Sequence, residues 1–129
     1  MYIYLAGKWS DKEDITHKMS QLTNMGHKIT HDWTLNESVT REPSDLGKFA
    51  QLDIDGVLMA DCFIGVMTDI KYAYRGTFTE IGCAIGTEKK IFIYCPDKES
   101  YCKTNCFFYH PSIVHFNTWE ELIESIKTK

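Results

Sequence analysis

The chain has 129 residues, of which 43% are hydrophobic and 13% aromatic, so it can bury the core of one domain and is not expected to be disordered. Its length predicts a single domain over residues 1–129. Fourteen Lys and Arg against 18 Asp and Glu give a formal charge of -4, and no segment concentrates basic and aromatic residues. Nucleic acid is therefore not expected as a partner.

The location is predicted from apolar runs and cysteines. No apolar run approaches the ~20 residues that cross a bilayer, so no membrane partner is expected. The apolar run over residues 1–6 lacks a basic flank and meets Gly7 and Lys8 too early for a signal peptide. The cysteine count of five is odd, and three of them lie in apolar stretches: Cys62, Cys83 and Cys95. We expect a reducing, cytoplasmic compartment.

The first half of the chain alternates β-rich runs with helical patterns. The apolar run over residues 2–6 predicts a strand that is covered on both faces. Ser10–Glu13 has the form of a capping box and predicts a helix that continues to a stop at Gly26. A short strand at residues 28–31 is followed by a polar loop over residues 32–44, a length that is often functional.

The second half continues the same alternation. It predicts a helix over 46–58, a strand over 62–67, a loop over 69–76, a helix over 77–86, strands over 90–94 and 113–116, and a last helix opened by a capping box at 118–121. Five strands that alternate with helices indicate βα units around a mostly parallel sheet. We therefore predict an α/β fold of the flavodoxin-like type, with strand order 2-1-3-4-5 and helices on both faces.

In an open parallel sheet, ligands bind beyond the carboxyl ends of the strands. Two carboxylates stand out near those ends. Glu80 lies in the predicted first turn of the helix after the third strand, between Gly76 and Gly82, and Asp53 lies in the preceding helix. The residues alone give Asp53 no role beyond that of a solvated charge on a helix face.

Glu80 has two interpretations at this point. Thr77 and Glu80 have the spacing of a capping box, which would stabilise the helix by about 1 kcal/mol without any substrate. Gly82 and Gly86 each cost the same helix close to ~1 kcal/mol relative to Ala. Close approach by a ligand, by the sheet or by a partner helix would explain them. The pattern leaves open whether Glu80 is a cap or a catalytic group.

Three blocks of sequence carry a resemblance to a known family. They are residues 2–7, the segment Asp53–Val57 with Ala60 and Asp61 behind it, and the run 76–84 with residues 89–91 beyond. Together they resemble the nucleoside 2-deoxyribosyltransferase family, which also contains N-glycosidases that act on deoxynucleoside 5'-monophosphates. The resemblance extends over residues 2–95, and its most specific part is the Gly-Thr-x-x-Glu-x-Gly-x-Ala block.

The resemblance implies a double displacement at C1' of 2-deoxyribose. Glu80 matches the family's nucleophile, which attacks C1' while the base leaves, and a second base or water then releases the sugar. Asp53 matches a carboxylate that contacts the sugar or assists proton transfer. We expect the helix N-terminus to favour ionised Glu80. No cofactor or metal is required. Similar enzymes are homo-oligomers in which a neighbouring subunit completes the pocket.

The resemblance also implies substrate-binding residues. Trp9 falls in the loop where family transferases place an aromatic ring that stacks on the base. The other candidates around the same loop and the specific block are Gly7, Lys8, Gly76 and Thr77. The expected ligands are a deoxynucleoside or deoxynucleotide and a free nucleobase.

The chain departs from the family pattern at two places. Transferases often carry an acid just before the Gly-Thr element to bind the base, and Arg75 stands there, which leaves Asp69 as the candidate acid. Monophosphate glycosidases hold phosphate with a Gly- and Arg-rich loop after the first strand, where this chain offers Gly7, Lys8 and Ser10. The second departure favours nucleosides, while Arg75 keeps monophosphates as an alternative.

Two further constellations have simpler interpretations. Cys102, Cys106, His110 and His115 are the residue types of a zinc site, but their spacing is not that of a finger or ribbon, and a surface loop with two thiols is the simpler interpretation. His31 at the end of the second strand either contacts substrate or hydrogen-bonds the adjacent Asp32.

Two other functional classes remain open. The first is a nucleotide-binding module that keeps the fold and pocket without catalysis. The second is a receiver-like signalling domain, because Asp69 follows the third strand as a phospho-acceptor would, although Gly7 and Lys8 stand where a receiver needs an acidic pair. The fold alone does not separate these classes from an enzyme, and the site has to decide.

Overall fold

The computed structural model describes residues 1–36 and 41–127, and its strands form one parallel sheet in the order β2-β1-β3-β4-β5. The strands are β1 (Tyr2–Ala6), β2 (Lys28–Ile29), β3 (Cys62–Val66), β4 (Lys90–Tyr94) and β5 (Ile113–Phe116). The α-helices are α1 (Lys12–Asn24), α2 (Pro43–Met59), α3 (Arg75–Gly86) and α4 (Trp119–Ser125). Short 3-10 helices are η1 (Trp9–Asp11), η2 (Trp33–Leu35), η3 (Tyr101–Thr104) and η4 (Cys106–Tyr109). The predicted flavodoxin-like strand order is confirmed.

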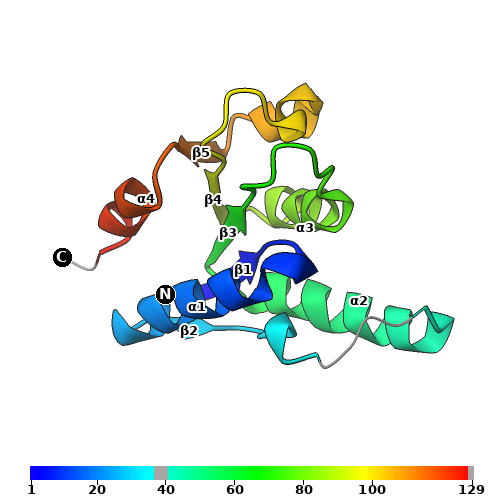
Figure 1. Ribbon diagram of the computed structural model, residues 1–129. Helices are drawn as coiled ribbons and strands as arrows, with labels where there is room; N and C mark the ends of the chain where they lie inside the picture. The colour runs from blue at the N-terminus through cyan, green and yellow to red at the C-terminus, as the bar shows by residue number, and fades with distance from the viewer. Residues whose placement is uncertain (37–40, 128–129) are drawn as a thin grey trace.

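Helices cover both faces of the sheet (Figure 1). α1 and α4 lie on one face, where the Trp119 indole donates a hydrogen bond of 2.7 Å to Gln21. α2 and α3 lie side by side on the other face. Within residues 1–36 and 41–127, no helix combines the length and the apolar character needed to cross a membrane.

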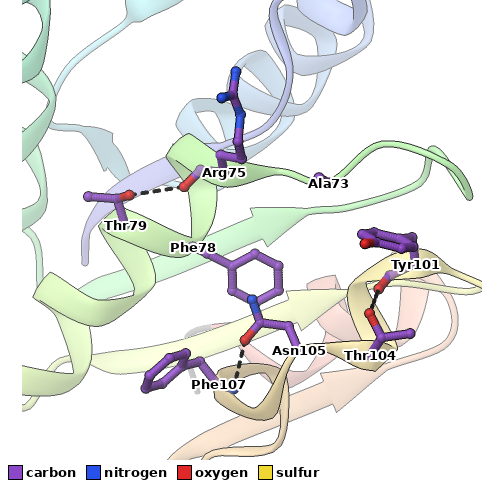
Figure 2. Close-up of a pocket in the computed structure, with 8 residues that line it drawn as sticks. All are labelled: Ala73, Arg75, Phe78, Thr79, Tyr101, Thr104, Asn105 and Phe107. Atoms are coloured by element: carbon purple, nitrogen blue, oxygen red, sulfur yellow. Dashed lines mark hydrogen bonds between the residues drawn. The ribbon is translucent and has the colours of Figure 1, made fainter.

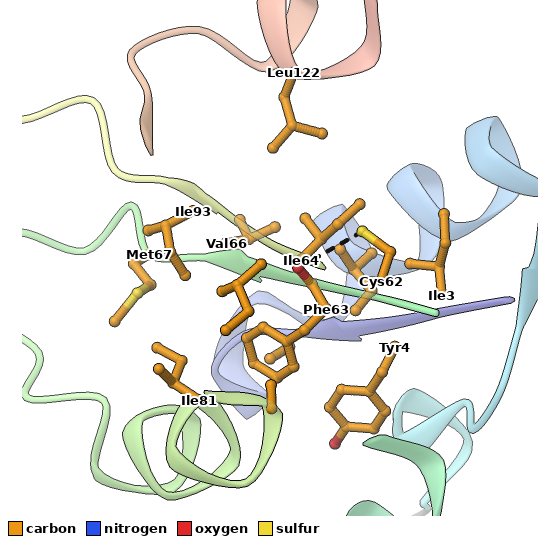
Figure 3. Packing of buried hydrophobic residues seen from close by; sticks show 14 of the residues in the cluster. Ile3, Tyr4, Cys62, Phe63, Ile64, Val66, Met67, Ile81, Ile93 and Leu122 are labelled. Carbon is orange, nitrogen blue, oxygen red and sulfur yellow. Dashed lines mark hydrogen bonds between the residues drawn. The ribbon is translucent and has the colours of Figure 1, made fainter. Parts of the chain in front are cut away.

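The central strands are buried because both of their faces are covered. Every residue of β3 is buried, as expected for a strand in the middle of a parallel sheet. Figure 3 shows Tyr4, Phe63 and Ile81 on the side of α3 and Leu122 on the opposite side. The rings of Tyr4 and Phe63 stack with centroids 5.8 Å apart. This stacking orients the Tyr4 ring so that its hydroxyl lies beneath α2 and α3.

The structure corrects several predicted helix starts. The predicted capping box at Ser10–Glu13 is wrong. Ser10 and Asp11 belong to η1, and α1 begins at Lys12 without a side-chain cap. α2 begins earlier than predicted, at Pro43, because the fixed φ of proline suits the first helical turn. The cap at Thr118 is confirmed, since its side chain accepts a hydrogen bond of 3.1 Å from the Glu121 amide.

Two strands and one helix also differ from their predicted bounds. The second strand ends at Ile29 and the third at Val66, so both are shorter than predicted. α3 begins at Arg75, before the predicted start at Thr77. The residue before it, Tyr74, has φ 52°, a left-handed conformation that is uncommon outside glycine. The earlier start of α3 places Glu80 beyond its first turn.

Candidate active site

A cavity of about 240 Å³ opens at the carboxyl ends of β1 and β3, where the strand order reverses. It lies between the loop after β1, the segment around η2, and the facing parts of α2 and α3. The lining residues are Tyr4, Gly7, Trp9, Trp33, Asn36, Phe49, Asp53, Gly76, Thr77 and Glu80. The cavity therefore brings together Glu80 and Asp53, which were predicted from separate blocks of sequence.

Glu80 is held by a side chain from the sheet rather than by the helix start. The Tyr4 hydroxyl donates a hydrogen bond of 2.6 Å to Oε2 of Glu80. No side chain caps α3, and no acidic residue lies in its first turn. The capping-box interpretation of Thr77 and Glu80 is therefore wrong, and the carboxylate faces the cavity.

The environment of Glu80 opposes its ionisation. Burial raises the pKa of Glu80 to about 7, the Asp53 charge adds to this rise, and the hydrogen bond from Tyr4 partly offsets it. The expectation that the helix N-terminus keeps the carboxylate ionised is corrected, because burial dominates and Glu80 lies outside the first turn. Glu80 is thus a carboxylate that changes protonation near neutral pH.

Tyr4 remains a neutral hydrogen-bond donor at physiological pH. Burial raises the pKa of its phenol above the ordinary value, and the nearby Glu80 and Asp53 carboxylates raise it further. Its hydroxyl has one proton, which it donates in a hydrogen bond to Glu80. This donation stabilises ionised Glu80 more than protonated Glu80.

Asp53 pairs with a histidine from the segment after β2. His31 Nε2 lies 3.5 Å from Asp53 Oδ1, and their side chains are 21% and 30% exposed. Burial raises the pKa of Asp53, while His31 and the Tyr4 hydroxyl lower it. The local His31–Asp32 bond was a wrong prediction, since Asp32 accepts a hydrogen bond from the Thr34 amide instead. Asp53 is therefore a second carboxylate in the cavity, and its pKa lies above the ordinary value for Asp.

Gly56 lets α2 approach Tyr4 and His31. A Cβ at this position would lie 2.9 Å from Tyr4 Cδ2 and 2.9 Å from His31 Cβ, closer than such atoms pack. The Thr30 hydroxyl also donates a hydrogen bond of 2.7 Å to the Gly56 carbonyl. The absence of a side chain at Gly56 thus sets the distance between the sheet and the helix that carries Asp53.

Two tryptophans form an aromatic wall of the cavity. Trp33 is buried, and its indole donates a hydrogen bond of 2.8 Å to the Leu5 carbonyl. Trp9 is half-buried, with its ring centroid 6.5 Å from that of Trp33. Lys12 Nζ lies 4.6 Å from the Trp9 ring centroid. The predicted aromatic residue Trp9 therefore lies beside a second ring, Trp33, which is held by its hydrogen bond to the sheet.

Lys8 and Asp69 are paired with each other. Their ammonium and carboxylate groups form a salt bridge, which lowers the pKa of Asp69 and raises that of Lys8. Asp69 also accepts a hydrogen bond of 3.0 Å from the Lys71 amide, and Tyr74 accepts one of 3.0 Å from the Asp69 amide. Neither Lys8 nor Asp69 lines the cavity. The structure thus separates these two predicted binding residues from the carboxylates.

The start of α3 contributes backbone to the cavity. Gly76 and Thr77 line it, and Thr77 is buried. Arg75 is exposed and lines a different cavity. Within residues 1–36 and 41–127, a Cβ at Gly82 or Gly86 would have no atom within 4 Å outside the adjoining backbone of α3, so neither the sheet nor another described helix explains these glycines.

The cysteine and histidine cluster does not assemble into a metal site. Among residues 1–36 and 41–127, no three His, Cys, Asp or Glu side chains come close enough to hold a metal ion together. Cys106 is exposed but Cys102 is buried, which corrects the interpretation of two surface thiols. His110 hydrogen-bonds Ser112 at 2.8 Å, while the His115 ring packs on Phe108.

The sequence did not single out three residues that line the cavity: Tyr4, Asn36 and Phe49. Tyr4 lies in a strand whose residues are nearly all buried, so no alternation distinguishes the side that faces the cavity. Asn36 falls in the long loop expected to be functional, although no motif identified it. The unexplained glycine inside α2, Gly56, was the available signal for a close approach at this point.

Comparisons with known proteins bear on this site. The model for the nucleoside 2-deoxyribosyltransferase family matches residues 3–124. Among curated protein sequences, none matches this chain. A 2-deoxyribosyltransferase from Bacillus psychrosaccharolyticus has a TM-score of 0.68 and 22% sequence identity, covering 95% of this chain and 90% of its own.

Two other solved structures share the fold. The CMP N-glycosidase BcmB of Clostridium botulinum has a TM-score of 0.63 and 22% identity, covering 98% of this chain and 97% of its own. A 2-deoxyribosyltransferase from Leishmania mexicana has a TM-score of 0.61 and 14% identity, covering 96% and 95%. The family match sets aside the receiver-like interpretation. With nearly the whole length matched by the family model, this chain belongs to the nucleoside 2-deoxyribosyltransferase family.

Proposed function

We propose that this protein cleaves the N-glycosidic bond of a 2'-deoxynucleoside and transfers the deoxyribosyl group to another nucleobase. The observation that carries the proposal is Glu80: a half-buried carboxylate held by Tyr4 inside a cavity at the switch point of the sheet. Family membership supplies the reaction class.

In the first step, Glu80 attacks C1' of the sugar. Its Oε2 is engaged by Tyr4, so Oε1 is the oxygen left for attack. The C1'–N bond breaks, and its electron pair leaves with the base, which then takes up a proton. Asp53 lines the same cavity as Glu80, and we assign it the role of providing that proton.

In the second step, a nitrogen of the incoming base attacks C1' and releases Glu80. The proton that this base loses returns to Asp53, so the enzyme ends in the state in which it began. Two displacements at the same carbon retain its configuration. A 2-deoxy sugar lacks an electron-withdrawing hydroxyl next to C1', which makes its oxocarbenium-like transition state accessible to a carboxylate nucleophile.

The walls of the cavity favour a neutral donor. Among the residues that the structure describes, its lining includes the two acids Asp53 and Glu80 and no Lys or Arg. Lys8, in the neighbouring loop, is paired with Asp69. Two carboxylates repel a phosphate, so the lining supports a nucleoside, whose base would stack on Trp9 or Trp33.

A second candidate is hydrolysis of deoxynucleoside 5'-monophosphates. It is favoured by the start of α3, which has no side-chain cap and exposes Gly76 to the cavity. Unpaired backbone N–H groups at a helix start bind phosphate oxygens well. Arg75, at the first position of α3, forms no ion pair within the described part of the chain. One solved structure of the same fold is a CMP N-glycosidase.

Chromatography of reaction mixtures tests both candidates. Deoxynucleosides and, separately, their 5'-monophosphates are incubated with the protein, with and without a second free base. Formation of a new nucleoside supports the transferase, and base release from monophosphates alone supports the glycosidase. Folded protein that does neither would contradict both and leave a nucleotide-binding module.

The proposal includes self-association, because α2 and α3 present an unpaired apolar surface. Leu52, Leu58 and Met59 of α2 are 46%, 45% and 62% exposed. The neighbouring α3 exposes Gly82 and Gly86, which allow close approach of another helix. Sedimentation velocity of the wild type should show an oligomer that Leu52→Glu dissociates. A monomeric wild type would contradict this part of the proposal.

A further inference from the structure

A second cavity lies on the other side of α3 from the reaction cavity. Its volume is about 530 Å³, within the range of small-molecule sites of roughly 300–1,000 Å³. Figure 2 shows Phe78 pointing from α3 towards Asn105 and Phe107, with Tyr101 and Thr104 on the adjoining segment. None of these residues lines the reaction cavity.

The aromatic content of this second cavity is high. Phe78, Tyr101 and Phe107 all line it. Tyr101 and Phe107 are each 58% exposed. Rings exposed in this way provide stacking surfaces for a flat heterocycle.

The polar groups of the cavity supply both donors and acceptors. Asn105 Oδ1 accepts a hydrogen bond of 2.9 Å from the Phe107 amide, which fixes the side chain and leaves its Nδ2 to donate. Thr79 and Thr104 donate their hydroxyl protons to backbone carbonyls at 3.0 and 2.7 Å. Their oxygens are thus available to accept.

The walls also indicate a neutral ligand. The only charged residue of the lining is Arg75, and Figure 2 shows its guanidinium directed away from Phe78 and Asn105. A flat, neutral ring with donors and acceptors on its edge has the chemistry of a nucleobase. The ring nitrogens and carbonyl oxygens of a nucleobase can accept hydrogen bonds from Asn105 Nδ2. Its N–H groups can donate hydrogen bonds to the hydroxyl oxygens of Thr79 and Thr104.

We infer that this second cavity binds a free nucleobase. The choice of a nucleobase among flat heterocycles rests on the proposed function, which releases and consumes such bases. Phe78 and Thr79 directly precede Glu80 in α3, so the two cavities are separated by one helix. A base bound here contacts the helix that carries the proposed nucleophile.

NMR spectroscopy of the 15N-labelled full chain, titrated with adenine and separately with cytosine, tests this inference. The expected result is saturable shifts of the Asn105 side-chain amide and of the Thr104 and Phe107 backbone amides. The indole N–H groups of Trp9 and Trp33 report on the reaction cavity in the same spectra. The two cavities are therefore followed separately.

Two variants and a matched control accompany the titration. Phe107→Ala should weaken base binding at the second cavity about tenfold through lost stacking. Asn105→Asp keeps an oxygen for the Phe107 amide but removes the Nδ2 donors, and should weaken binding about fivefold or more. Tyr109→Ala removes a ring of η4 that is 60% exposed but does not line the cavity, and should leave the affinity unchanged.

The outcomes separate this inference from the proposed function. Saturable shifts at the indoles alone would overturn the second site while leaving the reaction intact. Shifts that persist in Phe107→Ala and Asn105→Asp, or that follow protein concentration without any base, would also overturn it. Binding at Asn105 and Phe107 in a protein without transfer or hydrolysis would support the site and contradict the proposed function.

Discussion

The Tyr4 hydroxyl donates a hydrogen bond of 2.6 Å to Glu80 Oε2, although 76 residues separate the two in the chain. This contact links the central strand β1 to the helix α3 and orients the carboxylate in the cavity. Burial raises the pKa of Glu80 to about 7 despite the donated bond. The protonation of Glu80, and with it the proposed activity, should therefore depend on pH around neutrality.

Replacing Glu80 with Gln should abolish turnover. The amide has nearly the same shape but cannot attack C1' as an anion, so we expect kcat to fall by about 10³-fold or more. Chromatographic measurement of base release and exchange checks this expectation. A Glu80→Gln enzyme within tenfold of the wild type would remove Glu80 from the proposed role.

The same variant should be more stable than the wild type at alkaline pH. A carboxyl whose folded pKa is about 7, above the ordinary value of 4.5, holds its proton better when folded, so stability is lost as the pH rises through that window. Gln does not ionise, and its advantage should grow between pH 4.5 and pH 7, reaching about 2 kcal/mol after allowance for partial exposure. Denaturant unfolding at pH 5 and pH 8 measures the difference, and an equal effect at both pH values would contradict the assignment.

Tyr4→Phe should move the acid limb of the pH profile of kcat/KM to higher pH. The variant loses the donor that lowers the pKa of Glu80 while keeping the ring that packs on Phe63. Hydrogen bonds to charged groups are worth about 1.5–3 kcal/mol, so kcat/KM at pH 6 should fall at least about tenfold and recover partly at pH 8. A uniform loss at all pH values would show that Tyr4 has only a structural role.

Asp53→Asn should move the acid limb of the pH profile of kcat/KM to lower pH. The Asp53 charge contributes to the raised pKa of Glu80, and its removal lets Glu80 ionise at lower pH. The absolute rate should fall as well, by about 10²-fold or more, because the proposed proton carrier is lost. A pH profile of kcat/KM separates the two effects, and a limb that stays in place would rule out electrostatic coupling of these carboxylates.

Gly56→Ala should damage both stability and activity. The added Cβ would meet Tyr4 and His31 at 2.9 Å, and relieving such overpacking typically costs about 1–3 kcal/mol. Gly47→Ala, in the same helix, meets no atom of the described residues within 4 Å and should stabilise by about 0.5–1 kcal/mol. Thermal unfolding of the pair gives the comparison. Equal behaviour of the two variants would contradict the close approach at Gly56.

The sequence predicted the sheet better than the details of the site. Apolar runs identify β1, β3 and β4, since a buried parallel strand is apolar along most of its length. The start of α3 was misplaced because a left-handed tyrosine, Tyr74, precedes it instead of a side-chain cap. That displacement moved Glu80 out of the first turn and removed the local explanation for it.

The sequence predicted which motif residues form the site, but it did not predict their tertiary contacts. Residues in motif blocks, such as Glu80 and Asp53, do meet in the cavity. The partnerships of His31 with Asp53 and of Lys8 with Asp69 depend on tertiary distances that no local pattern encodes. Tyr4 falls in the strand that was predicted to be covered on both faces, and its ring is in the core while its hydroxyl donates a hydrogen bond.

The most direct test of the account is mass spectrometry of the intact protein, quenched rapidly after mixing with a deoxynucleoside. The account predicts a mass increase equal to one deoxyribosyl group, located by proteolysis on the peptide that contains Glu80. The increase should be absent from Glu80→Gln. Turnover without any covalent adduct, or an adduct on another residue, would contradict the central role given to Glu80.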